Sequence, residues 1–168
     1  MNKDRITLRD VIETSKAAER EAQTFYRGLA ERFSHLPEIS EFWRLMLDEE
    51  IDHERLIASI EAQLSEDELR SPEDPARAHK VREFLKYRAT DMLGTVRNLD
   101  DAYKLAVNLE FSEINRLMEF LVNSFVHIEE ERASILDVIE RHHKRLKTVP
   151  DIIGNTEIRR RISVREGY

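Results

Sequence analysis

Apolar residues recur at spacings of three and four along most of the chain, which is the period of one face of an α-helix. Pro37 closely follows the first of these periodic segments and Pro150 the last, and proline disfavours helix in the residue before it. The pattern therefore predicts four amphipathic helices, at residues 7–34, 38–64, 99–122 and 128–147.

The connections between these segments are short, long and short. Short links favour antiparallel neighbours, and the long link at 65–98 allows the second pair of helices to cross over beside the first. A weaker periodic stretch at 76–90 predicts a short helix within this crossover, and Asn123 marks a turn before the last helix. We therefore expect an all-α, antiparallel four-helix bundle of two helical hairpins within residues 1–150, followed by a C-terminal tail at 151–168.

Composition narrows the possible functions. The net charge is −7, from 27 basic and 34 acidic residues, whereas a nucleic-acid-binding domain usually carries a basic surplus. The absence of cysteine excludes disulfides, cysteine-ligated zinc, iron–sulfur clusters and thiol nucleophiles. The sequence has neither a signal peptide nor an apolar run of membrane-spanning length. We expect a soluble, cytoplasmic protein that binds neither nucleic acid nor a membrane.

Ionisable residues interrupt the apolar stripes of all four predicted helices. Burying one carboxylate is costly, and burying several together adds mutual repulsion, which bound cations offset. A projection at 100° per residue places the following residues on or near the inward faces: Glu19, Glu50, His53, Glu110, Glu113, Glu140 and His143.

The spacing of these residues indicates the kind of cation. Glu50 and His53 are three residues apart, as are Glu140 and His143, so each pair projects from one side of a helix and can reach one metal ion. Carboxylate with imidazole suits iron, manganese or zinc, whereas calcium and magnesium prefer oxygen ligands. Glu140 lies toward the edge of its stripe, and a shift of one residue would make His142 the inward group instead.

The two halves of the chain also resemble each other. Glu19 precedes Glu50 by 31 residues, and Glu110 precedes Glu140 by 30 residues. Each half is therefore a helical hairpin with one glutamate on its first helix and a Glu-x-x-His pair on its second.

This set of motifs resembles the ferritin-like di-iron carboxylate proteins, and within them the rubrerythrin-like branch. The resemblance covers residues 7–147, with a long interruption at 65–98. Three stretches carry it: Ala18-Glu19-Arg20-Glu21-Ala22 with Phe25-Tyr26, Glu49-Glu50-Ile51-Asp52-His53-Glu54-Arg55-Leu56, and Glu110-Phe111-Ser112-Glu113.

The resemblance implies two iron ions per chain, for which manganese or zinc could substitute. Glu50 and Glu140 would bridge the two ions. Glu19 and His53 would bind one ion, Glu110 and His143 would bind the other, and Glu113 would exchange with His53 as the oxidation state changes. Because the chain lacks cysteine, it lacks the rubredoxin-like domain of full-length rubrerythrins, and turnover would need a separate electron donor.

The expected function is reduction of hydrogen peroxide or oxidation of Fe(II), with H2O2 or O2 as substrate, in protection against oxidative stress. The resemblance also implies a homodimer or a higher homo-oligomer. Two alternatives remain open: an iron storage or handling protein without turnover, and a non-catalytic bundle, metal-free or holding zinc, that binds a partner protein.

Overall fold

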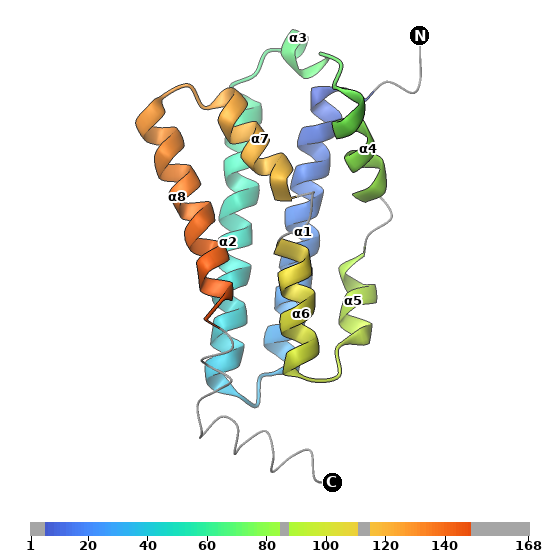
Figure 1. The fold of residues 1–168 in the computed structure, drawn as a ribbon, viewed down its shortest axis with the longest axis vertical. Coiled ribbons are helices and arrows are strands. Elements are labelled where there is room, and N and C mark those ends of the chain that lie inside the picture. The colour runs from blue at the N-terminus through green and yellow to red at the C-terminus, as the bar shows by residue number, and fades with distance from the viewer. Residues whose placement is uncertain (1–5, 85–87, 111–114, 149–168) are drawn as a thin grey trace.

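The computed structural model describes residues 6–84, 88–110 and 115–148. Within these residues the chain forms helices and no strand, apart from one isolated β-bridge between Thr7 and Pro72 (Figure 1). This architecture confirms the expected all-α bundle. The described helices are α1 (Leu8–Arg32), α2 (Pro37–Ala62), α3 (Glu66–Leu69), α4 (Pro75–Phe84), α5 (Ala89–Thr95), α6 (Leu99–Glu110), α7 (Asn115–Phe125) and α8 (Glu129–Leu146).

The first hairpin, α1 and α2, agrees with the first two predicted helices. Thr7 caps the start of α1 in a capping box with Asp10, which satisfies backbone N–H groups that have no partner inside the helix. Pro37 is the first residue of α2, where its missing N–H costs nothing. The two helices lie antiparallel and side by side (Figure 1), and a 2.8 Å ion pair between Lys16 and Glu61 joins them.

The second pair of predicted helices, 99–122 and 128–147, corresponds to three described helices: α6 and α7 for the first, and α8 for the second. The predicted helix at 99–122 is covered by α6 and α7, and residues 111–114 between them lie outside the described residues. The predicted turn at Asn123 is wrong, because α7 continues to Phe125. The Asn123 side chain donates a hydrogen bond of 2.9 Å to the carbonyl of Glu119, one turn earlier, so its amide is satisfied within the helix. Helix α8 lies along α2 (Figure 1).

Within its described residues, 65–84 and 88–98, the crossover contains three short helices, α3, α4 and α5, where the sequence predicts only one. It is attached to the start of α1 by the Thr7–Pro72 bridge and by a backbone hydrogen bond of 3.0 Å from Leu8 to Ser71. Helices α4 and α5 then pack along α1, on the side of the bundle away from α8 (Figure 1). None of the helices in the described part of the chain is both long enough and apolar enough to cross a membrane.

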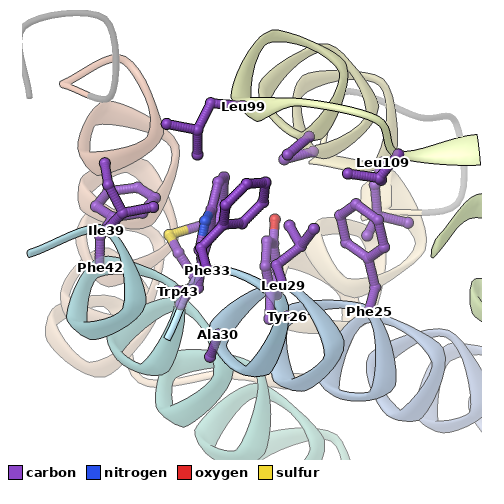
Figure 2. Close-up of a cluster of buried hydrophobic side chains, with 14 of the residues drawn as sticks. Phe25, Tyr26, Leu29, Ala30, Phe33, Ile39, Phe42, Trp43, Leu99 and Leu109 are labelled. Atoms are coloured by element: carbon purple, nitrogen blue, oxygen red, sulfur yellow. The ribbon is translucent and has the colours of Figure 1, made fainter. Parts of the chain in front are cut away.

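Two separate apolar clusters fill the bundle, one near each end. The first joins the C-terminal part of α1, the N-terminal part of α2, α5 and α6. In Figure 2, Tyr26 of α1 and Trp43 of α2 point toward α6, and their rings stack with centroids 5.8 Å apart. The second cluster joins the opposite ends of α1 and α2 to α4, α7 and α8, with Ile12, Ile57 and Leu121 among its members. The bundle therefore has an apolar core at each end.

The crossover helix α5 approaches α1 at a glycine, and this contact can be tested. A Cβ atom on Gly28 would lie 2.5 Å from Cδ1 of Leu93, whereas a Cβ on Gly94 of α5 meets nothing within 4 Å. Both Gly28→Leu and Gly94→Leu gain helix propensity, but only at Gly28 must the Leu93 side chain be displaced. We therefore expect Gly28→Leu to have a free energy of unfolding about 1–2 kcal/mol lower than that of Gly94→Leu, the matched control.

Urea denaturation followed by the fluorescence of Trp43, the sole tryptophan of the chain, measures both variants. Equal stability of Gly28→Leu and Gly94→Leu would contradict the packing of α5 on α1.

Candidate metal centre

A buried polar layer separates the two apolar clusters. On α1, α2 and α8, polar side chains lie between the residues of one cluster and those of the other. On α6, a polar side chain follows the residues of the first cluster. These polar side chains have exposed fractions of 1% to 5%. The layer consists of Glu19 of α1, Glu50 and His53 of α2, Glu110 of α6 and His142 of α8.

The first half of the layer is formed by Glu19, Glu50 and His53. Nδ1 of His53 lies 3.1 Å from Oε2 of Glu50 and 3.8 Å from Oε2 of Glu19. One ligand atom from each of the three side chains lies within 4.8 Å of the other two, so together they can hold a metal ion. Helix geometry produces the pairing, because residues three apart on α2 project from the same side.

The second half is formed by Glu50, Glu110 and His142. Nε2 of His142 lies 3.0 Å from Oε1 of Glu50 and 2.9 Å from Oε2 of Glu110. The ligand atoms of these three side chains also lie within 4.8 Å of one another. Tyr26 donates a hydrogen bond to Oε1 of Glu110, so that carboxylate is held on its other side. Glu50 belongs to both halves, and the rings of His53 and His142 are 5.0 Å apart.

Several ligand atoms in the layer form no hydrogen bond. Four buried side-chain atoms of the described residues lack a hydrogen-bond partner, and three of them belong to this layer: Oε1 of Glu50, Nε2 of His53 and Nε2 of His142. Oε1 of Glu50 and Nε2 of His142 face each other as an ion pair, whereas for Nε2 of His53 neither a hydrogen bond nor an ion pair is seen among the described residues. Buried polar atoms without a hydrogen bond are rare in folded proteins because each costs desolvation free energy. Carboxylate oxygens and imidazole nitrogens are also the ligands that iron, manganese and zinc accept. The residues of the layer therefore fit a pair of such ions.

The electrostatics of the layer show how its charges balance without metal. Burial raises the pKa of Glu19 and of Glu110 above the usual value, and the nearby carboxylate of Glu50 adds to both shifts. Burial also acts to raise the pKa of Glu50, but His142 and His53 outweigh it and lower that pKa well below normal. Burial lowers the pKa of His53, yet Glu19 and Glu50 raise it overall to about 10. In the metal-free protein the imidazolium groups therefore supply the positive charge.

Of the seven residues that the sequence places on the inward faces, the structure brings four together: Glu19, Glu50, His53 and Glu110. His143 borders the layer, since its side chain is 20% exposed and its Nε2 lies 4.0 Å from Oε2 of Glu110. Glu113 lies outside the described residues.

The structure does not bring Glu140 into the layer, and the expectation that it points inward is wrong. Its side chain is 62% exposed, and its carboxylate pairs at 2.8 Å with Nζ of Lys144, one turn later on the same outer face of α8. The error is one of helix phase. The sequence stripe on this helix includes Ala133, which the structure leaves exposed, and this shifts the centre of the stripe toward Glu140.

Two residues of the layer and its surroundings are not among the expected ligands. His142 takes the inward place on α8, and Glu49 contacts it from α2. The signal for His142 lies in its spacing: Ile139, His142 and Leu146 are the buried residues of α8, and they are separated by three and four. Glu49 gives no such signal, because it lies beside Glu50 in a run of charged residues.

The charge balance of the layer predicts how the stability of the metal-free protein depends on pH. The folded pKa of His53, about 10, exceeds its unfolded value near 6.5. Its contribution is therefore fully present below the unfolded pKa and is lost as pH rises through the folded one. Thermal denaturation at pH 6 and pH 9.5 should show a Tm lower by roughly 5 °C at the higher pH. His53→Gln should show a smaller decline, and an equal decline in both proteins would contradict this assignment.

Comparisons with known proteins agree with this layer. A family model described as Rubrerythrin matches residues 10–149. The comparisons with curated proteins and with solved structures give no match. The matched region covers most of the chain and includes every residue of the buried polar layer. The chain therefore belongs to the rubrerythrin family.

Proposed function

We propose that the buried polar layer binds two iron ions and that the protein uses them to reduce hydrogen peroxide. The observation that carries this proposal is the convergence of five buried carboxylate and imidazole side chains in two overlapping groups that could each hold a metal ion, within a layer that apolar clusters enclose at both ends. Membership of the rubrerythrin family supports iron as the metal.

The two overlapping groups suggest how the ions would be held. Glu19 and His53 would bind the first ion, and Glu110 and His142 the second. Glu50 is the one residue common to both groups, and its two oxygens already face different partners: Oε2 faces His53 and Oε1 faces His142. Glu50 would therefore bridge the two ions.

A pair of Fe(II) ions in this layer would supply the electrons that reduction of hydrogen peroxide requires. Two Fe(II) ions supply the two electrons that reduce one H2O2, with two protons, to two water molecules, and both ions become Fe(III). The chain holds the carboxylates in place, excludes bulk water through its apolar clusters, and fixes one oxygen of Glu110 by the hydrogen bond from Tyr26. Because the chain has no cysteine to ligate a rubredoxin-type iron centre, a separate electron donor would restore Fe(II).

The choice of oxidant is tested by loading the protein with Fe(II) anaerobically and mixing it with H2O2 or with O2. We expect about two iron ions per chain, and a rate of Fe(III) formation at least about tenfold higher with H2O2 than with O2, corresponding to about 1.4 kcal/mol in the barrier. Stopped-flow absorbance measures the rates. The double variant Glu50→Ala, His53→Ala should bind little iron and serves as the control.

Other outcomes would assign the protein differently. A faster reaction with O2, with a growing ferric core, would indicate iron storage in place of peroxide reduction. Binding of zinc without any oxidation of iron would favour a structural bundle that interacts with a partner protein.

The ligands from α8 are tested by a pair of neighbouring variants. We expect His142→Ala to lose one of the two ions, because its Nε2 faces Glu50 and Glu110. His143→Ala and Glu140→Ala should keep both ions, because His143 lies at the border of the layer and Glu140 on the exposed face. Metal analysis after anaerobic loading measures the content per chain. The reverse result would mean that α8 is rotated by one residue when metal is bound, with Glu140 and His143 as its ligands.

A further inference from the structure

Both nitrogens of the His142 imidazole contact carboxylate groups. Nε2 faces the layer, 3.0 Å from Glu50 and 2.9 Å from Glu110. Nδ1, on the other side of the ring, donates a hydrogen bond of 2.9 Å to Oε2 of Glu49. A neutral imidazole carries a proton on only one of its nitrogens. When that proton is on Nδ1 and is hydrogen-bonded to Glu49, Nε2 has a free lone pair that can bind a metal ion.

Glu49 is itself held in place from α8. Its second oxygen, Oε1, accepts a hydrogen bond of 3.0 Å from Nε of Arg145, and Nη2 of the same guanidinium lies 2.9 Å away in an ion pair. His142 and Arg145 are three residues apart, so one face of α8 presents both side chains to the same carboxylate. Each oxygen of Glu49 thus has its own partner, which fixes the plane of the carboxylate as well as its position.

Glu49 and Glu50 are neighbours on α2, and their positions on the helix explain why they contact opposite sides of the His142 ring. Consecutive residues of a helix project about 100° apart. Glu50 therefore points into the layer, with 1% of its surface exposed, while Glu49 points toward α8 and is 25% exposed on its side chain. The ring of His142 lies between these two neighbouring carboxylates, with one nitrogen facing each.

We infer that Glu49 is a positioning residue for the second metal ion: by accepting the Nδ1 proton of His142, it fixes the tautomer and the ring orientation that direct Nε2 toward Glu50 and Glu110. This inference rests on the proposed metal-binding function. Hydrogen bonds from a ligating histidine to a carboxylate act in this way in metal sites generally, and their loss weakens metal affinity 10- to 100-fold.

The test is titration of the metal-free protein with Co(II), comparing Glu49→Gln with a matched control, Glu54→Gln. Glu54 is also on α2, its side chain is also 25% exposed, and it also forms an ion pair with another helix, through Arg20 of α1. It differs in that its partners, Arg20 and Gln23, lie outside the layer. Both variants therefore lose one interhelical carboxylate, but only one of them loses the contact with His142.

We expect the wild type to bind two Co(II) ions. Glu49→Gln should bind the second ion about 10- to 100-fold more weakly and with altered Co(II) absorption bands, while the first ion binds as in the wild type. Glu54→Gln should bind both ions normally. Thermal denaturation of the metal-free variants measures the general loss of packing, which should be similar in the two.

Three results would overturn the inference in distinguishable ways. If Glu49→Gln binds the second ion with the affinity and spectrum of the wild type, Glu49 does not position His142. If both ions are weakened equally in Glu49→Gln, the role of Glu49 is structural. If the wild type binds no Co(II) or Fe(II), the proposed metal-binding function itself fails, and the inference fails with it.

Discussion

The repulsion among three buried carboxylates is the constraint on which the rest of the bundle depends. Glu19, Glu50 and Glu110 meet at one level, with almost no access to water. Carboxylates in such surroundings must be protonated or must be paired with positive charge. The bundle supplies that charge through His53 and His142, and the chemistry of the same five side chains also suits metal ions. The layer is thus a site whose charge can be balanced by protons or by metal.

The apolar clusters on either side of the layer offset the free-energy cost of burying its charged groups. Each cluster is anchored by large buried side chains, such as Trp43 in one and Leu121 in the other, and together they supply the hydrophobic stabilisation that a polar layer cannot. They also lower the local dielectric, which strengthens every interaction between charges in the layer. The same helices therefore provide stability at their two ends, through the apolar clusters, and the chemistry of the site between them, through the polar layer.

The sequence predicts most of the fold and much of the site, and the failures have physical causes. The long amphipathic helices follow from their period, and Glu19, Glu50, His53 and Glu110 follow from their places on strongly apolar stripes. Helix α8 has only three buried residues, so its stripe is too weak to define the phase to within one residue, and Glu140 is placed inward in error. The contact of Glu49 with His142 joins two helices far apart in sequence, and no local pattern encodes it.

The sparse burial of α8 has a consequence for how the layer is reached. With only Ile139, His142 and Leu146 buried, this helix contributes little apolar surface to the bundle, and Glu49 of α2 holds it through polar contacts with His142 and Arg145. Elements with few buried apolar contacts open at the lowest free energy in native-state exchange. Opening of α8 would remove His142 from the layer and expose Glu50 and Glu110, which face it, to water and to ions. Docking of this helix and capture of metal would then be one coupled event, in which each stabilises the other.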